Sequence, residues 1–475
     1  MNRRWWALVA VSLATFMTYL DNNVVNVALP TIQRDLGLTI SGLEWIVSGY
    51  ILVFAGLLLA GGRLADVFGQ RRIFVLGLVV FSLASTAAGL STDGTMLVLS
   101  RGVQGVGAAL LTPTALSLIP RIFPDTRERN TAVGLWSAVG ALALAFGPLT
   151  GGFISENWHW GWIYLINVPI GALTLALGLW ALPRDSARSR GSSLDLPGLA
   201  ASATALFALT YALIEGESQG WTSAVTLGSF AVAAAAAALF VMIERRVTQP
   251  MIDLSLFRER VFSGGLTAMG LWAFGVFGIY FFTALWLQNV LGYSPIEAGS
   301  AFIPMALLMA AVATVAPRLA ARFGTAPTVA AGLALMSGSV LALSFTGADG
   351  AYRDLLPWFL MYGLGAGLLV PLTNAILDTL QKGRAGVASG TLNVSREVFG
   401  LLGITVLGAI LNARQNTSLT TGATPLTAFL DGYQLALTIA AAIMAVGVPL
   451  SLLTLRRHPV SPVVPEPPKL LESVA

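Results

Sequence analysis

The chain has 475 residues, of which 56% are hydrophobic and only 11% are charged, and its mean hydropathy is +0.77. Soluble domains carry about a quarter charged residues, so this composition excludes a water-soluble fold. The sequence has no cysteine and two histidines, which excludes disulfides, zinc sites and redox centres. The net charge of +4 comes from basic residues scattered in short turns, which is typical of orientation in a membrane and excludes a nucleic-acid interface.

The N-terminal segment places Arg3 and Arg4 before an apolar run at residues 5–20. A cleaved signal peptide is one interpretation of this pattern. The polar residues 21–23 follow without a small-residue cleavage site, which favours a retained first membrane span.

A helix needs about 20 apolar residues to cross the hydrocarbon core, because lipid offers no partner for an unpaired backbone group. Fourteen segments meet this requirement, so the sequence predicts an all-α polytopic membrane protein with 14 transmembrane helices. An even number of spans places both termini on the same side. The expected spans are residues 5–27, 44–62, 73–91, 96–120, 131–154, 161–182, 197–215, 224–243, 263–289, 298–318, 328–346, 355–375, 387–411 and 433–455.

Basic residues are distributed unequally between the two sets of connecting turns. One set carries 22 of the 27 Arg and Lys residues, whereas the opposite set carries only Arg34, Arg353 and Arg414. Arg101 and Arg396 fall inside spans. Cytoplasmic turns are enriched in Arg and Lys, so we expect a multi-pass protein of a bacterial-type inner membrane with both termini in the cytoplasm.

The sequence repeats itself at a spacing of 255 residues: Gly37 recurs as Gly292, and residues 63–65 recur as 318–320. The repeats keep one orientation, so we expect two six-helix bundles related by an axis along the membrane normal, with a substrate site between them near mid-depth. The predicted boundaries are residues 1–195 for the N-terminal bundle, 196–245 for a two-helix insert, 246–457 for the C-terminal bundle and 458–475 for a disordered cytoplasmic tail.

Asp21 lies inside the first span, which is otherwise mainly apolar. An acid at membrane depth is costly and is therefore a candidate functional residue. We interpret Asp21 as a carboxylate in apolar surroundings that couples transport to proton binding; the alternative is a structural hydrogen-bonding role.

The first cytoplasmic turn reads GRLADVFGQRR at residues 62–72. Gly62 and Gly69 permit a tight reversal, and Asp66 can accept hydrogen bonds from a helix N-terminus or from arginine. We interpret these three residues, with Arg71 and Arg72, as a latch that closes the cytoplasmic face in one conformation. An ordinary charged turn is the alternative.

Two further charged groups join Asp21 as candidates for proton coupling. Arg101 shares a helix face with Gln104, three residues on, so its charge can point into the bundle; the alternative is a structural role in which Arg101 extends to the membrane surface. Glu397 lies in span thirteen beside Arg396, but adjacent helical residues point about 100° apart and need not pair.

Span five contains Gly140, Gly147, Pro148, Gly151 and Gly152. Proline breaks one backbone hydrogen bond, and the glycines form a groove against which another helix can pack. The pattern is compatible with a role in coupling and equally with general small-residue packing.

Aromatic and polar residues in several spans are candidates for a cavity that takes a flat lipophilic ligand. Aromatic belts at the membrane interfaces explain part of the pattern without any ligand. The candidate cavity residues are Asn26, Gln104, Trp136, Tyr280, Trp286 and Tyr362.

These motifs together resemble the major facilitator superfamily. The turn at residues 62–72 is similar to the family's signature loop, and a degenerate copy at residues 317–327 has Ala321 in place of the acid. The segment around Arg101 resembles the family's arginine motif. The resemblance extends over nearly the whole chain.

Two motifs narrow the resemblance to the fourteen-span drug:proton antiporters. Residues 147–152 are similar to a motif found chiefly in antiporters, and residues 20–30 to the first-helix motif of this group, except that Asn23 replaces the usual threonine. The resemblance implies a monomeric antiporter in the lipid bilayer, which exchanges protons for small hydrophobic or cationic drugs or antibiotics by alternating access.

Other function classes fit the residues less well. A proton-coupled importer on the same fold is the main alternative, but it would lack the span-five motif and the two-helix insert. An enzyme would need clustered catalytic groups, whereas the spans contain no His or Cys and few acids. The chain has no nucleotide-binding motif, so no cofactor is expected and the proton gradient is the natural driving force.

Overall fold

The computed structural model describes residues 3–185, 195–247, 250, 252, 254–347, 351–378 and 385–455. The predicted tail at residues 458–475 lies outside them. The described helices are α1 (Arg3–Leu36), α2 (Ile40–Phe68), α3 (Gln70–Gly89), α4 (Gly94–Ile122), α5 (Thr126–Asn157), α6 (Trp162–Leu165), α7 (Asn167–Ala181), α8 (Leu196–Gln219), α9 (Ala224–Glu244), η1 (Leu254–Arg258), α10 (Arg260–Asn289), α11 (Pro295–Ala301), α12 (Ile303–Phe323), α13 (Thr325–Leu343), α14 (Tyr352–Gly367), α15 (Val370–Asp378), α16 (Ala385–Thr420) and α17 (Pro425–Thr454).

Local sequence signals set where several helices begin. Thr39 accepts a hydrogen bond from Gly42 N at 3.2 Å at the start of α2, and Asp93 accepts one from Met96 N at 2.9 Å at the start of α4. These side chains satisfy N–H groups that have no partner within the helix. Short polar turns therefore separate long apolar helices.

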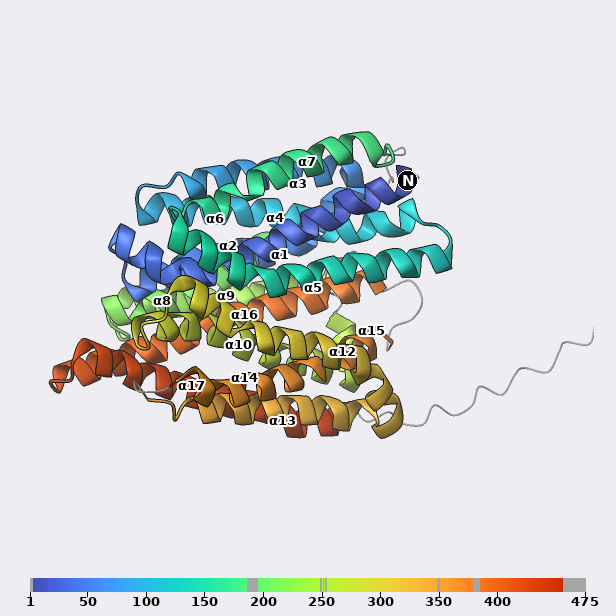
Figure 1. Cartoon of the computed structure of the whole chain (residues 1–475). Helices are drawn as coiled ribbons and strands as arrows, with labels where there is room; N and C mark the ends of the chain where they lie inside the picture. The colour runs from blue at the N-terminus through green and yellow to red at the C-terminus, as the bar shows by residue number, and fades with distance from the viewer. Residues whose placement is uncertain are drawn as a thin grey trace, which may run out of the picture.

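The helices confirm the predicted all-α membrane fold. Thirteen candidate spans in the described residues are long and apolar enough to cross a membrane, and α5, with 32 residues, runs alongside them in the bundle (Figure 1). Three of the predicted spans contain a short interruption, which separates α6 from α7, α11 from α12 and α14 from α15. Pro169, Pro304 and Pro371 follow these breaks; proline lacks an N–H and its ring clashes with the preceding turn.

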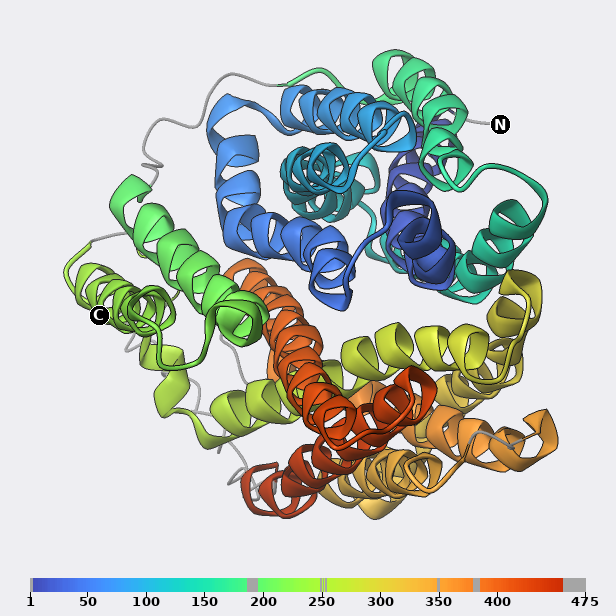
Figure 2. The same cartoon turned by 90° about the vertical axis from the view of Figure 1, so that its left-hand side faces the viewer.

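The helices form two units that lie side by side. Helices α1 to α7 make up the N-terminal unit and α10 to α17 the C-terminal unit (Figures 1 and 2). Helix α8 packs against both α2 and α16, so the insert contacts both units. We call the end of the bundle that carries the start of α1 the N-terminal end, and the opposite end, where α1 stops and α2 begins, the α1–α2 end.

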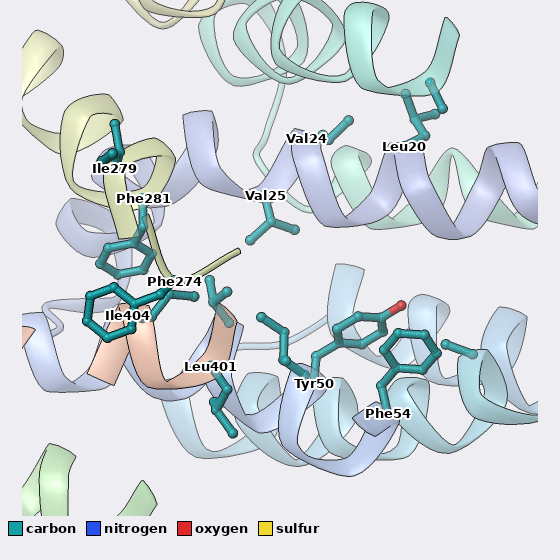
Figure 3. Packing of buried hydrophobic residues seen from close by; sticks show 14 of the residues in the cluster. Leu20, Val24, Val25, Tyr50, Phe54, Phe274, Ile279, Phe281, Leu401 and Ile404 are labelled. Carbon is teal, nitrogen blue, oxygen red and sulfur yellow. The ribbon is translucent and has the colours of Figure 1, made fainter. Parts of the chain in front are cut away.

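The two units meet closely at the α1–α2 end. Gln288 donates a hydrogen bond to the carbonyl of Val27 at 2.7 Å, and Ile296 N donates one to Glu156 Oε2 at 3.1 Å. Farther into the bundle, apolar side chains of α1, α2, α10 and α16 gather where the units meet (Figure 3). The conformation is therefore one in which the units are joined at the α1–α2 end.

Candidate functional site

A fully buried ion pair joins α1 to α4. Arg101 Nη1 lies 2.5 Å from Asp21 Oδ2, and both side chains are 0% exposed. A buried charge is stable only when it is paired and hydrogen-bonded, so Asp21 and Arg101 each supply the counter-charge and a hydrogen-bond partner for the other. The face of α4 predicted for Arg101 does point into the bundle.

Amides complete the surroundings of the Asp21 carboxylate. Its Oδ1 accepts hydrogen bonds from Gln104 Nε2 and Asn167 Nδ2, each at 2.8 Å. The same amide nitrogens donate to Ser85 Oγ at 3.2 and 3.0 Å, and Ser85 donates to the carbonyl of Tyr164 at 2.8 Å. The expectation of an apolar environment for Asp21 was wrong, because side chains from α3, α4 and α7 surround it with donors.

The guanidinium of Arg101 has additional contacts beyond Asp21. Its Nε donates to the carbonyl of Ile46 at 3.2 Å, and its Nη1 donates to Gln104 Oε1 at 2.7 Å. Its Cζ lies 4.2 Å from the ring centroid of Tyr50 and 5.6 Å from that of Tyr164, within the range of cation–π attraction. Arg101 therefore links α4 to both α1 and α2.

This cluster depends on both of its charges. Loss of the negative charge on Asp21 would leave Arg101 as an uncompensated buried cation, which costs roughly 3–5 kcal/mol in comparable sites. The loss of the pair would favour a conformation that gives Arg101 water or another acceptor.

Asn167, Ser85, Tyr50 and the carbonyl of Ile46 also belong to this site, although no sequence motif pointed to their role here. Asn167 carried a usable signal, since it is the first residue of α7, directly after the break that precedes Pro169. Polar side chains at helix breaks within a membrane often line functional sites. Ser85 and Tyr50 carried no such signal, because only the packing of α2 and α3 brings them to Asp21.

A second buried acid lies in the C-terminal unit. Glu397 Oε1 accepts hydrogen bonds from Arg396 Nη2 at 2.8 Å and Nε at 3.2 Å. The pairing that the sequence left open does form, because the long arginine side chain bends back to its neighbour. Arg396 also interacts with the hydroxyl of Tyr19 on α1, and Tyr50 lies within electrostatic range of Asp21, Arg101 and Glu397. The two charged clusters therefore face the same region between the units.

The span-five motif lies on α5 and touches two other helices. A Cβ on Gly147 would lie 2.5 Å from Asn23 Cβ, and one on Gly151 would lie 2.5 Å from the carbonyl oxygen of Val24. A Cβ on Gly140 would lie 3.0 Å from the ring of Tyr19. These glycines allow α1, the helix that carries Asp21, to pack closely against α5.

The other side of the same motif meets the C-terminal unit. A Cβ on Gly152 would lie 2.3 Å from the carbonyl oxygen of Pro295, and a Cβ on Gly299 would lie 2.1 Å from that of Pro148. Real Cβ atoms do not approach backbone atoms this closely. The motif therefore belongs to the contact between α5 and α11 that joins the two units.

The residues predicted to form a latch lie at the N-terminal end, between α2 and α3. Gly69 has φ +104°, which favours glycine, and a Cβ at this position would lie 2.5 Å from the carboxyl group of Asp185. Asp185 accepts hydrogen bonds from Arg71 N and Arg72 N at 3.0 and 3.2 Å, and Gly62 borders Pro113. The side chain of Asp66 lies outside the described part of the structure, so its role stays a prediction.

Replacing Asp185 with alanine should lower stability. The carboxylate caps the first turn of α3 and forms an ion pair with Arg121 at 3.3 Å, so we expect a loss of about 1–2 kcal/mol in the free energy of unfolding. Chemical unfolding in detergent measures this change. The free energy of unfolding of Asp185→Asn should lie between those of the unmodified protein and Asp185→Ala, because the amide oxygen still accepts hydrogen bonds from the backbone. A free energy of unfolding of Asp185→Ala equal to that of the unmodified protein would contradict the capping role.

The residues predicted for a substrate cavity lie at separate places. Gln104 belongs to the Asp21 cluster, Trp136 Nε1 donates to Thr15 Oγ1 at 2.8 Å, and Asn26 contacts the Asn22 carbonyl at 3.5 Å. In the C-terminal unit, Tyr280 stacks on Phe302, Trp286 stacks on Tyr433, and Tyr362 is buried. Their role in substrate binding stays a prediction.

A cavity of about 1060 Å³ opens at the α1–α2 end between the two units and the insert. We call it the vestibule. It combines amide groups with aromatic side chains and Glu215, whose Oε1 accepts a hydrogen bond from Trp45 Nε1 at 2.8 Å. Its lining residues are Gln33, Thr39, Ile40, Ser41, Gly42, Trp45, Glu215, Ser218, Leu285, Asn289, Val290, Asn412, Gln415, Asn416, Pro425, Leu426 and Phe429.

Comparison with known proteins decides the family. The model of the Major Facilitator Superfamily matches residues 11–404. The chain belongs to the major facilitator superfamily. It is 37% identical over 455 residues to the puromycin resistance protein pur8 of Streptomyces alboniger, covering 94% of this chain and 89% of that protein.

Further comparisons place this major facilitator superfamily chain among exporters and support its fold. It is 36% identical over 414 residues to the tetracenomycin C resistance and export protein of Streptomyces glaucescens, covering 87% of this chain and 77% of that protein. The fold matches the inward-facing crystal structure of a bacterial homologue of the human lysosomal transporter Spinster, with a TM-score of 0.69 at 17% identity. The match covers 97% of this chain and 100% of that chain. The protein is a transporter related to antibiotic exporters.

Proposed function

We propose that the protein is a proton-coupled antiporter that exports small hydrophobic or cationic antibiotics by alternating access. The observation that carries this proposal is the ion pair of Asp21 and Arg101, buried between α1 and α4. An acid that exchanges a proton in this pair can link the proton gradient to the packing of the helices around it. The names of the relatives, which describe resistance to and export of antibiotics, support the substrate class.

The contacts between the two units support a specific transport cycle. In the conformation described here, the units are joined at the α1–α2 end through α5, α10 and α11. We assign this end to the outside of the cell and both termini to the cytoplasm, since the basic residues are concentrated in the opposite turns. Protonation of Asp21 from outside and its deprotonation toward the cytoplasm would then drive the exchange, with one chain as the functional unit.

Purified protein in liposomes provides the test. Puromycin and tetracenomycin C serve as probes, and an imposed pH gradient with the membrane potential clamped should drive their accumulation against a concentration gradient. An ionophore that collapses the pH gradient should stop accumulation. Accumulation of the probe that is the same with and without the pH gradient would refute proton coupling. Movement of the probe in the same direction as the protons would indicate an importer.

A further inference from the structure

A second cavity, of about 620 Å³, opens at the N-terminal end of the bundle, where α3 and α7 lie side by side (Figure 1). We call it the arginine pocket. Arginines line one part of it and aliphatic side chains line the other. Its lining residues are Arg71, Arg72, Val75, Leu76, Val79, Leu179, Arg184 and Asp185. A cavity in which basic and apolar groups meet suits a ligand that carries both a negative charge and a hydrocarbon chain.

The positive charge of the arginine pocket is not balanced by its own residues. Asp185 is the acid among them, and its carboxylate already accepts hydrogen bonds from two backbone N–H groups of α3 and forms an ion pair with Arg121 at 3.3 Å. The guanidinium of Arg71 donates to a backbone carbonyl of α7, which is a neutral group. Arg72 and Arg184 form no ion pair with any acid in the described part of the chain. The pocket therefore keeps an excess of positive charge.

Neighbouring aromatic residues place the arginine pocket at the depth of the lipid headgroups. Trp180 directly follows the pocket residue Leu179, is exposed, and packs edge-on against Trp6 with 6.4 Å between the ring centroids. Exposed tryptophans beside arginines are typical of the boundary between membrane and water. In the proposed orientation this end faces the cytoplasm, and the cytoplasmic leaflet carries the negatively charged lipids.

An apolar strip leads from the arginine pocket along α3 toward the middle of the membrane. Leu76, Val79 and Leu83 follow one another at spacings of three and four residues, so they share one face of the helix. All three side chains are exposed, as is Leu179 of α7 on the other side of the pocket. A lipid whose headgroup lies at the arginines could therefore lay an acyl chain along this strip.

We propose that the arginine pocket binds an anionic phospholipid of the cytoplasmic leaflet, with its phosphate at Arg72 and Arg184 and an acyl chain on Leu76 and Val79. Arginine suits this task, because its planar guanidinium forms paired hydrogen bonds with phosphate oxygens and is weakly hydrated. Arg72 belongs to α3 and Arg184 follows α7, so the bound lipid joins these two elements. The inference uses the proposed orientation of the chain but does not depend on proton antiport.

Native mass spectrometry of the purified protein counts bound lipids as lipid is added. The probes are phosphatidylglycerol, which is anionic, and phosphatidylcholine, which has no net charge. Phosphatidylglycerol should bind about 30-fold more tightly at one site, since each arginine near an anionic lipid surface contributes a factor of about five. Glycerol phosphate, which lacks acyl chains, should not displace it at equal concentration. Equal affinity for the two lipids, or displacement by glycerol phosphate, would overturn the inference.

The double variant Arg72→Gln with Arg184→Gln tests the charged half of the pocket. Its affinity for phosphatidylglycerol should fall about 30-fold, to the level of phosphatidylcholine. The matched control is Arg245→Gln with Arg246→Gln, which removes two exposed arginines that follow α9 and do not line the pocket. The control has the same net charge as the test variant but should keep the unmodified affinity. Equal losses of affinity in the two variants would indicate only general attraction between charges and would overturn the inference.

Leu76→Gln tests the apolar half of the pocket without changing any charge. The side chain is 50% exposed on the outer face of α3, so the variant should fold, and thermal unfolding without added lipid checks this. Its affinity for phosphatidylglycerol should fall about tenfold, because the acyl chain loses apolar contact. Leu239→Gln on α9 is the matched control, since Leu239 is 48% exposed and lies outside the pocket. Equal affinities of these two variants for phosphatidylglycerol would also overturn the inference.

Discussion

Asp21→Asn should abolish antibiotic accumulation driven by a pH gradient. The asparagine preserves the shape of the side chain but cannot bind and release a proton, so the gradient can no longer act on the ion pair with Arg101. We expect gradient-driven transport to fall by roughly two orders of magnitude, while exchange of labelled for unlabelled substrate without a gradient continues. Transport by purified protein in liposomes measures both quantities.

One control variant and one stability measurement separate the coupling role of Asp21 from indirect effects. Asp35→Asn removes an exposed acid from the same helix and should transport like the unmodified protein. Asp21→Asn also leaves Arg101 buried without its counter-charge, which should lower the free energy of unfolding by roughly 3–5 kcal/mol unless the site rearranges. A folded Asp21→Asn protein that still concentrates substrate in response to pH would exclude Asp21 as the coupling acid.

Gly299→Ala should prevent the units from joining at the α1–α2 end. Its Cβ would lie 2.1 Å from the carbonyl oxygen of Pro148, a backbone atom that cannot move aside as a flexible side chain can. Such overpacking typically costs 1–3 kcal/mol, so the closed population should fall roughly 10- to 100-fold, and transport with it. Reaction of a single engineered cysteine in the vestibule with a membrane-impermeant reagent should become correspondingly faster.

Gly56→Ala provides the comparison for this prediction. It also replaces a helical glycine, but its nearest neighbour, Ala203 Cβ, would lie 3.9 Å from the new methyl group, an ordinary contact. Both changes raise helix propensity by about 1 kcal/mol, so their difference isolates the clash. Equal transport and equal labelling in the two variants would rule out the α5–α11 contact as a required closing surface.

The sequence predicted the fold because the membrane limits the solutions. Long apolar segments must form helices in lipid, and the repeat of Gly37 at Gly292 predicts two units of the same orientation. The prolines that break three spans were visible in the sequence, but a proline can either bend or interrupt a helix. Only the packed structure shows that Pro169, Pro304 and Pro371 follow actual breaks.

The sequence predicted the principal charged groups of the site but not their partners. Asp21, Arg101 and Glu397 stand out because a charge in an apolar span is costly. Asn167 and Ser85 are ordinary polar residues. Their place in the Asp21 cluster depends on how α3 and α7 pack against α1 and α4.

The helical spans, the family motifs and the location of the costly charges could all be predicted from sequence, because each of these depends on local chemistry in lipid. The tertiary structure alone decided that Asp21 pairs with Arg101 among amides, that the glycines of α5 face both α1 and α11, and that Arg72 and Arg184 line one pocket. These features depend on contacts between distant segments, which are set by how all the helices pack together and not by the pattern of any one of them.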